Sequence, residues 1–396
     1  MKTLNWSTIH AKRQRNIITY FLRPISFIYG LAIQLRLIAY NVGLLRIKSI
    51  PAYVISIGNI TTGGTGKTPF VAMLAEWAGN NGFRVAILSR GYRGKRSHNT
   101  LVVSDGNKVL ASVDEAGDEP FLLAKKLSSV PVLISKKRYR IGYLALRLFN
   151  SELLLLDDGY QHLSLHRDLN ILLLDAKRPF GNRFLLPLGP LREPVEQIKR
   201  ADLIIITRCT DEHPGDDLVD FLQRNFSEKP IFRSGNFPDQ VIYPLGGKAY
   251  APGILSGKSV VAFAGLANPD DFLEMVKSLG AHVIHFKAFS DHHPFSKEEI
   301  EELASWKKRS DVDFLLTTEK DWVRIDGKIG VDLDIAILVI KIGLLSGPPT
   351  SAPPASQARA LGAGRQEKAG TDTFFDVIRQ GILKSTLKKY EAQIQI

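Results

Sequence analysis

Between residues 51 and 226, short apolar runs alternate along the chain with segments of helical periodicity. Several runs are apolar at every position, which is typical of strands buried on both faces of a parallel sheet. The runs predicted to be strands are 53–57, 85–89, 131–134, 153–156, 171–174 and 203–206. The segments predicted to be helices lie at about 69–81, 118–128, 138–149 and 193–200. This alternation predicts a doubly wound, mostly parallel α/β domain, with its functional residues at the carboxyl ends of the strands.

A second α/β pattern follows a stretch rich in Pro and Gly, residues 227–258. Its predicted strands are 260–264, 282–286, 314–317 and 335–340, with helices at 269–279 and 296–307. The pattern predicts a smaller second α/β lobe, and the Pro- and Gly-rich stretch is expected to connect it to the first domain.

The composition changes again after residue 345. Residues 346–370 are poor in large apolar side chains and rich in Pro, Ala, Gly and Ser, which predicts a disordered linker before a terminal helix near 372–389. The predicted organisation is an arm (1–50), a core domain (51–226), a second lobe with its connection (227–345), and a linker with a C-terminal helix (346–396).

The arm contains the most apolar long stretch of the chain, residues 17–45. Arg23 and Arg36 leave only twelve uncharged residues between them, whereas a membrane-spanning helix needs about 20. Placed on a helix, the polar and small positions form one narrow stripe beside a wide apolar face, which favours an amphipathic helix at a membrane interface. Pro24 is expected to kink or divide it. The alternative is a helix that packs on the core domain with its arginines solvated.

Charge supports the membrane interpretation. The 396 residues include 52 Lys and Arg against 40 Asp and Glu, a net charge of +12, and the first 50 residues hold eight of the basic side chains and no acidic one. An acid-free basic segment is attracted to anionic lipid. Its basic residues are interleaved with Ile and Leu rather than clustered with exposed aromatic residues, which argues against nucleic acid as a partner. The single cysteine, Cys209, excludes an internal disulfide framework.

The segment 58–68, GNITTGGTGKT, follows a predicted strand and precedes a predicted helix. Glycines allow the backbone amides to curl around phosphate oxygens, Lys67 can contact the β- and γ-phosphates, and the hydroxyl of Thr68 can bind Mg²⁺. Thr61 replaces the first Gly of the usual Walker A pattern. The sequence therefore predicts a nucleoside triphosphate site, with these candidate binding residues: Thr61, Thr62, Gly63, Gly64, Thr65, Gly66, Lys67 and Thr68.

Acidic residues follow two of the predicted strands. Asp157 and Asp158 come directly after four leucines, as in a Walker B strand, and are candidate Mg²⁺ ligands. Asp175 is a weaker candidate of the same kind, because a strand-end Asp commonly caps a turn. The acids of Gly117-Asp118-Glu119-Pro120 open a helix and could serve only as favourable N-terminal charges.

Four of the nine histidines lie in the second lobe. His282 and His285 would point to opposite faces of one strand and have no cysteine nearby, which argues against a zinc site. In the loop Asp291-His292-His293, a catalytic or phosphate-facing role is preferred to metal binding.

Taken together, these motifs resemble the tetraacyldisaccharide 4'-kinase (lipid A 4'-kinase) family over roughly residues 15–342. The matching segments are SIGNITTGGTGKTP (56–69), LSRGY (88–92), GDEP (117–120), DDGYQH (157–162), RDLNILLLDA (167–176), GNRFLLPLGPLREP (181–194), ADLIIITR (201–208), SDHHPFS (290–296) and LLTTEKDWVR (315–324). Thr61 agrees with the family's own loop.

The resemblance implies a P-loop core, a smaller lobe and a membrane-associated N-terminal helix. It also implies transfer of the ATP γ-phosphate to the 4'-hydroxyl of a tetraacylated disaccharide 1-phosphate, which yields lipid IVA. The enzyme would lie on the cytoplasmic face of the inner membrane of a Gram-negative bacterium, with an anionic lipid disaccharide as substrate and no obligate protein partner.

The resemblance also implies roles for individual residues. Asp118 would be the general base, with His292 paired to it across the cleft, and Lys67 would grip the phosphates. Mg²⁺ would be served by Thr68 with one or both of Asp157 and Asp158. Three further residues are candidates beside the site: Glu119, Arg192 and Glu193.

Two other function classes compete with a kinase. A P-loop ATPase or switch could use the arm as a membrane tether, but a guanine-binding switch needs Asn/Thr-Lys-x-Asp, and in Thr318-Glu319-Lys320-Asp321 the lysine is displaced by one position. A non-catalytic membrane-surface protein is disfavoured because the P-loop Lys and Thr and the strand-end acids are all present.

Overall fold

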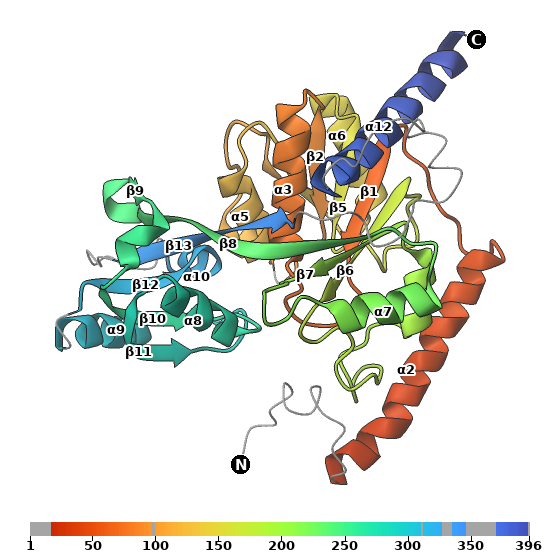
Figure 1. The fold of residues 1–396 in the computed structure, drawn as a ribbon. Helices are drawn as coiled ribbons and strands as arrows, with labels where there is room; N and C mark the ends of the chain where they lie inside the picture. The colour runs from red at the N-terminus through yellow and green to blue at the C-terminus, as the bar shows by residue number, and fades with distance from the viewer. Residues whose placement is uncertain are drawn as a thin grey trace.

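The computed structural model describes residues 17–92, 94–96, 100–309, 312–326, 335–345 and 370–394. The linker expected over 346–370 lies almost entirely outside these residues. Across the described chain, 13 strands form one sheet in the order β11-β10-β12-β13-β8-β7-β6-β1-β5-β2-β4-β3, with β9 paired to β8. The two lobes lie side by side along this sheet (Figure 1).

The larger lobe confirms the predicted doubly wound fold. Its strands are β1 (Tyr53–Gly58), β2 (Val85–Ser89), β3 (Leu101–Ser104), β4 (Val132–Ile134), β5 (Leu153–Asp157), β6 (Leu169–Asp175), β7 (Leu203–Thr207) and the start of β8 (Ile231–Tyr243). All pair in parallel except β3, which is antiparallel to β4. Its helices are α3 (Lys67–Asn80), α4 (Val113–Ala116), α5 (Asp118–Lys126), α6 (Arg138–Phe149), α7 (Asp216–Asn225) and the 3-10 helix η1 (Val195–Arg200).

The continuous apolar character of these strands has a direct structural cause. Alternate residues of β5 enter two different cores: Leu153 and Leu155 pack with α3 and α5, whereas Leu154 and Leu156 pack with α6. The sheet is therefore covered on both faces, and all five residues of β5 are buried.

The smaller lobe has the predicted α/β character. Its elements are η2 (Pro244–Gly246), β9 (Lys248–Tyr250), η3 (Pro252–Leu255), β10 (Ser259–Ala264), α8 (Pro269–Ser278), β11 (His282–Ala288), α9 (Lys297–Arg309), β12 (Phe314–Thr318), α10 (Glu319–Ile325) and β13 (Ile335–Leu344). The strands β11, β10, β12 and β13 are parallel.

The long strand β8 joins the lobes. Its first residues pair in parallel with β7, and residues from Ser234 to Ile242 pair antiparallel with β13. This strand occupies part of the stretch expected to be only a connection. The Pro and Gly content concealed it: Pro238 is tolerated because the register shifts there, at a bulge opposite Val339 and Ile340.

The described part of the N-terminal arm contains one continuous helix, α2 (Ile17–Asn41), with Pro24 inside it, so of the two expected effects of Pro24, a kink or a division, the division does not occur. By length and composition, the segment Thr19–Asn41 of this helix could cross a membrane. Only 11% of its most apolar 18-residue stretch is buried. Phe21, Phe27 and Ile28 are 73%, 74% and 65% exposed.

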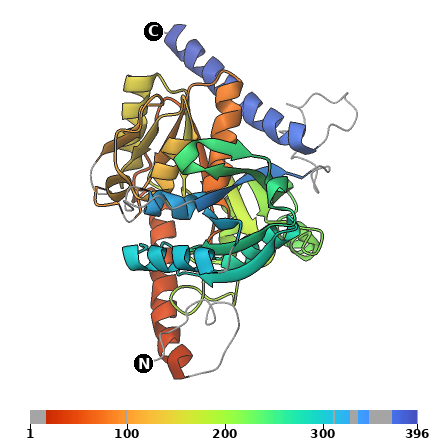
Figure 2. The ribbon, with the colours of Figure 1, turned by 90° about the vertical axis from the view of Figure 1, so that its left-hand side faces the viewer.

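The C-terminal helix α12 (Gly370–Ile394) is present as predicted. Phe374, Ile378 and Ile382 are buried in the main core beside Phe70 of α3. The two terminal helices extend from the core in opposite directions (Figure 1 and Figure 2).

Candidate active site

The loop after β1 has the backbone of a phosphate-binding loop. Gly63 and Gly66 have φ angles of 106° and 77°, which a residue with a Cβ adopts only with strain. Gly66 is the N-cap of α3, so Lys67 and Thr68 are the first two residues of that helix. The loop amides and the helix N-terminus together form an anion site.

Thr61, which stands where a Walker A loop has its first Gly, serves the scaffold. It is buried and forms a β-bridge with Leu191, and the amide of Thr62 donates to the carbonyl of Pro190 at 2.7 Å. Residues 62–68 line a large cavity, whereas Thr61 does not. Of the eight predicted nucleotide-binding residues, seven therefore face the cavity.

This cavity, about 1000 Å³ in volume, opens between the two lobes, and we call it the interlobe cavity. The core contributes the phosphate-binding loop, Asp157, Asp158 and Glu119. The second lobe contributes residues of α8 and the loop before it, of the β11–α9 loop and at the start of α10, while α2 adds Tyr29, Ile33 and Arg36.

The two strand-end acids have different environments. Asp158 lies 3.6 Å from Nζ of Lys67, and Nη1 of Arg192 donates to both its carboxylate oxygens at 2.8 and 2.9 Å. Burial raises the pKa of Asp158, but the charges of Lys67 and Arg192 lower it by more than burial raises it. The pKa therefore lies well below its ordinary value. Asp158 is therefore a paired anion.

One carboxylate oxygen of Asp157 has no hydrogen-bond partner among the described residues. Its Oδ2 accepts a hydrogen bond from Ser89 at 2.9 Å, but its buried Oδ1 has no partner among the described residues. Burial and the charges of Glu119 and Asp158 raise the pKa of Asp157 to about 6. A cation at this oxygen would relieve both the missing contact and the excess negative charge.

These donors fit Mg²⁺ in the way phosphoryl-transfer enzymes hold it. Mg²⁺ is usually bound by one or two carboxylates and completed by water and phosphate oxygens. Accordingly, no group of three or more His, Cys, Asp or Glu side chains that could hold a metal occurs in the described part of the chain. Asp157 and the hydroxyl of Thr68, both on the wall of the interlobe cavity, supply a donor set of this limited kind.

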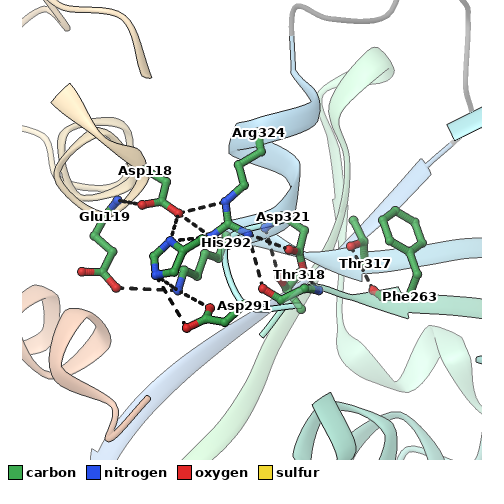
Figure 3. A network of polar contacts seen from close by, with 11 residues as sticks. Asp118, Glu119, Phe263, Asp291, His292, Thr317, Thr318, Asp321 and Arg324 are labelled. Atoms are coloured by element: carbon green, nitrogen blue, oxygen red, sulfur yellow. Dashed lines mark hydrogen bonds and ion pairs between the residues drawn. The ribbon is translucent and has the colours of Figure 1, made fainter. Parts of the chain in front are cut away.

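Asp118 and His292 meet beside the cavity, which His292 lines and Asp118 does not. Asp118 is the first residue of α5 on the core, His292 lies in the loop after β11, and His292 Nδ1 is 2.6 Å from Oδ2 of Asp118 (Figure 3). The other carboxylate oxygen accepts the amide of Glu119 at 3.0 Å. His292 has a positive φ of 61°, a conformation uncommon for non-glycine residues.

Arg324 of α10 completes this contact. It lies beside the same Asp118 oxygen, which its Nε reaches at 2.8 Å, and it is supported by Asp321 at 3.1 Å and by the carbonyl of Gly265 at 3.3 Å. Burial by itself raises the pKa of Asp118, but the hydrogen bond with His292 and the charge of Arg324 outweigh it and hold the pKa well below its usual range. The carboxylate is therefore ionised at neutral pH.

Lys320 lies among the charged groups next to the Asp118–His292 pair. Its Nζ lies 3.1 Å from Asp291, 3.3 Å from Nε2 of His292 and 3.6 Å from Glu119. The phosphate-binding loop, His292 and several cations therefore line one cavity, and His292 is paired there with the ionised carboxylate of Asp118. Such a set can bind a nucleotide and remove a proton from an acceptor hydroxyl.

Comparison with known proteins decides the family. The family model described as tetraacyldisaccharide-1-P 4'-kinase matches residues 18–350. The chain belongs to this family. The tetraacyldisaccharide 4'-kinase of Geobacter metallireducens is 40% identical over 337 residues, which cover 84% of this chain and 96% of that protein. That of Pelobacter propionicus is 39% identical over 351 residues, covering 87% and 94%.

A solved structure agrees with the family assignment. The crystal structure of LpxK from Aquifex aeolicus in complex with ATP is 37% identical, has a TM-score of 0.66, and covers 83% of this chain and 96% of that one. The resemblance found in the sequence is thereby confirmed, and so is the P-loop fold of the tetraacyldisaccharide 4'-kinase family.

The remaining residues that the sequence suggests for the site of this kinase differ in whether they line the cavity. Arg192 lines the cavity through its pairing with Asp158, and Glu119 lines it as well. Glu193 is fully buried behind the cavity wall, paired with Arg200, and burial raises the pKa of its carboxyl. Asp175 accepts the amide of Lys177 at 2.9 Å, pairs with Arg208, and does not itself line the cavity, which favours the turn-capping interpretation over metal binding.

Arg324 was not anticipated as a site residue. It lies inside the LLTTEKDWVR segment, which is part of the family resemblance. The neighbouring residues in the sequence do not indicate its role, because its partner Asp118 is 206 positions away in the chain. Lys320 of the same segment had no assigned chemistry, although it contacts His292 and Asp291.

Proposed function

We propose that this kinase transfers the γ-phosphate of ATP to the 4'-hydroxyl of a tetraacyldisaccharide 1-phosphate, producing lipid IVA. Its relatives have this activity in their names, and the related LpxK structure contains ATP. The observation that carries the proposal is the 2.6 Å contact between Asp118 and His292, because it pairs an ionised base with a histidine that lines the same cavity as the phosphate-binding loop.

The phosphate-binding loop and Lys67 would hold the β- and γ-phosphates. Thr68 and Asp157 would hold Mg²⁺, and Asp158 would bind a water of the ion; when bound, the ion would neutralise charge on the phosphate oxygens. Lys67 pairs with Asp158 at 3.6 Å here, and the arriving phosphates offer it a second set of anionic oxygens.

Asp118 would act as general base. The 4'-oxygen attacks the γ-phosphorus, the bond from that phosphorus to the bridging oxygen of ADP breaks, and the hydroxyl proton passes to the Asp118 carboxylate. A sugar hydroxyl is a poor nucleophile, so a positioned base and a cationic clamp on the phosphates are the two requirements. His292 and Arg324 both contact the same oxygen of this carboxylate and so fix its orientation.

The site is divided between the lobes. Asp118 belongs to the core, whereas His292 and Arg324 belong to the second lobe, so the base is oriented only while the lobes are in contact. Closure of this kind excludes water and limits futile hydrolysis of ATP.

The membrane helix would deliver the lipid. α2 exposes a wide apolar face and also lines the interlobe cavity through Tyr29, Ile33 and Arg36. We place it at the interface of the cytoplasmic leaflet of the inner membrane of a Gram-negative bacterium, where its basic arm is attracted to anionic lipid. The disaccharide headgroup can then reach the phosphate-binding loop without the acyl chains leaving the bilayer.

The decisive experiment supplies the purified full-length chain with γ-labelled ATP, Mg²⁺ and the tetraacyldisaccharide 1-phosphate. We expect label in a bis-phosphorylated lipid. Release of labelled phosphate with no labelled lipid would instead support a membrane-tethered ATPase and overturn the kinase proposal.

A further inference from the structure

A second cavity, about 770 Å³ in volume, lies beside α2 and is separate from the interlobe cavity. One wall is α2, through residues that include Phe27, Leu31 and Gln34. The opposite wall is formed by the segment 180–196 and by Phe221, Asn225 and Phe226 at the end of α7. We call this space the α2 groove.

The docking of α2 divides the two cavities. Ser26 Oγ donates to the carbonyl of Leu185 at 2.8 Å, and Gly30 lies so close that an added Cβ would be 2.8 Å from Leu185 Cδ1. On one side of this seam, Tyr29 and Ile33 face the interlobe cavity; on the other, Phe27 and Leu31 face the groove. Residues at these spacings lie on opposite flanks of a helix.

The groove has aromatic walls. The ring centres of Phe180 and Phe221 are 5.4 Å apart, and those of Phe221 and Phe226 are 6.4 Å apart, both edge to face. On the α2 side, Phe27 and Leu31 are 74% and 48% exposed, so the groove adjoins the exposed apolar face of α2; Ser26 and Gln34 also line this wall. Any apolar occupant can therefore enter it from the side on which α2 would meet lipid.

Positive charge is positioned at the groove. Arg183 lies over two of the aromatic rings, with its guanidinium carbon 6.0 Å from the centre of Phe180 and 5.8 Å from that of Phe221. Arg23 of α2 lines the opposite wall, and Glu196 is the one acidic residue among the lining positions. Apolar walls with a net positive rim complement an amphiphile that has an acyl chain and an anionic headgroup.

We propose that the α2 groove binds one acyl chain of an anionic bilayer phospholipid, with its phosphate near Arg23 and Arg183. This inference rests on the proposed membrane location of α2. A bilayer lipid suits the groove better than the substrate does, because the docking seam separates the groove from the cavity where the reacting sugar must lie. A chain in the groove would support α2, whose Tyr29 and Arg36 form part of the active-site wall.

Photolabelling tests the assignment on the full-length protein. We would add vesicles of phosphatidylglycerol with a diazirine in the acyl chain, irradiate them, and map the labelled peptides by mass spectrometry. Labels are expected in 180–188 and 221–226 as well as in α2. Labels confined to α2 would overturn the groove while keeping the membrane helix, and an unlabelled α2 would overturn the membrane location itself; the kinase assay reports independently on the activity.

Matched variants sharpen the test. Leu31→Asp puts a charge into the groove, whereas Ile28→Asp puts one on the outer face of α2, where Ile28 is 65% exposed. Both weaken membrane contact, but only Leu31→Asp should abolish the labels in 221–226 relative to those in α2. Equal loss in the two variants would contradict the groove.

The headgroup is tested separately. Replacing phosphatidylglycerol by phosphatidylcholine with the same chain, or Arg183 by Gln, should reduce groove labelling about fivefold, the effect expected of one basic residue near an anionic lipid. Arg178→Gln, which changes an arginine outside the groove, should reduce it less. Equal labelling by both lipids would overturn the preference for an anionic lipid, since both carry a phosphate, and unreduced labelling of Arg183→Gln would overturn the proposed phosphate contact.

Discussion

Asp118 makes contacts with both lobes of the kinase through a single carboxylate. One oxygen accepts an amide of its own helix, and the other meets His292 and Arg324 from the second lobe. Because the carboxylate is only 8% exposed, its orientation and its ionisation depend on these partners. Two predictions follow from this dependence.

Asp118→Asn keeps the shape of the side chain but removes its ability to accept a proton. We expect kcat to fall by about 10²-fold or more, with little change in the Kd for ATP, since the phosphate-binding loop is unaltered. Steady-state kinetics and nucleotide binding measure the two effects. Asp114→Asn, which changes an exposed acid paired with Lys95, should leave both unchanged; a normal kcat in Asp118→Asn would exclude it as the base.

Arg324→Gln should change the pH dependence of the reaction. Without the guanidinium, burial raises the pKa of Asp118 against less opposition. The base is active only when ionised, so the acid limb of kcat/KM should move upward by about 1 to 3 pH units. The stability that the ionised carboxylate contributes is present above its unfolded pKa and is lost as pH falls through the folded value. In the variant, whose folded pKa is higher, this contribution should be smaller and its loss should be complete at a higher pH.

The control for this shift is Arg309→Gln on α9, because Arg309 bonds only within its own helix, to Ser305, among the contacts described. Its pH profile should match that of the unchanged kinase. An acid limb at the same pH in Arg324→Gln would mean that Arg324 does not set the ionisation of Asp118.

At the scale of elements, the end of β7 links the phosphate-binding loop to the second lobe. The hydroxyl of Thr207 donates to the carbonyl of Thr65 at 3.0 Å, and the next residue, Arg208, bonds Asp271 of α8 at 2.7 Å. Lys177 adds a 3.1 Å contact to the same carboxylate. These contacts involve neither Asp118 nor His292, so the lobes have a second, separate attachment.

Asp271→Asn should weaken the second attachment. A hydrogen-bonded, partly buried ion pair contributes about 1.5 to 3 kcal/mol, so we expect the KM for ATP to rise about tenfold, because the loop before α8 would no longer be held against the phosphate-binding loop. Asp270→Asn removes an equal charge from the same turn of α8 and should leave KM near its original value. Similar kinetics in the two variants would show that the contact does not position the lobe.

For the whole molecule, the C-terminal helix is part of the main core although the family match ends at residue 350. Phe374 packs edge to face with Phe70 of α3 at 6.0 Å, and Phe375 stacks on Trp77 of the same helix at 4.7 Å. α3 also begins at the phosphate-binding loop, so the tail supports the helix that presents Lys67.

Phe374→Ala should therefore reduce the free energy of unfolding by about 3 to 5 kcal/mol, the usual loss for a buried aromatic side chain. Leu383→Ala, on the same helix but 50% exposed, should cost less than about 0.5 kcal/mol. Urea unfolding followed by circular dichroism measures both. Equal midpoints for the two variants would contradict the packing of α12 on the core.

The sequence by itself determined the features that depend on neighbours in the chain. The apolar runs of β1, β5 and β7 predict strands that are buried on both faces. The glycines before Lys67 predict the phosphate-binding loop, because a residue without a Cβ adopts the positive φ angles of that loop without strain. Asp118 and His292 were identified as a pair only through the family resemblance, since 174 positions separate them.

Only the tertiary structure decided what depends on distant partners. The strand β8 is stabilised by β7 and β13 rather than by its own composition, so its Pro and Gly concealed it. Asp157 and Asp158 are adjacent and chemically identical, yet Arg192 and Lys67 reach only Asp158 and leave an oxygen of Asp157 for a cation. Burial and charge at a site are sums over residues far apart in the chain, and local pattern contains no record of them.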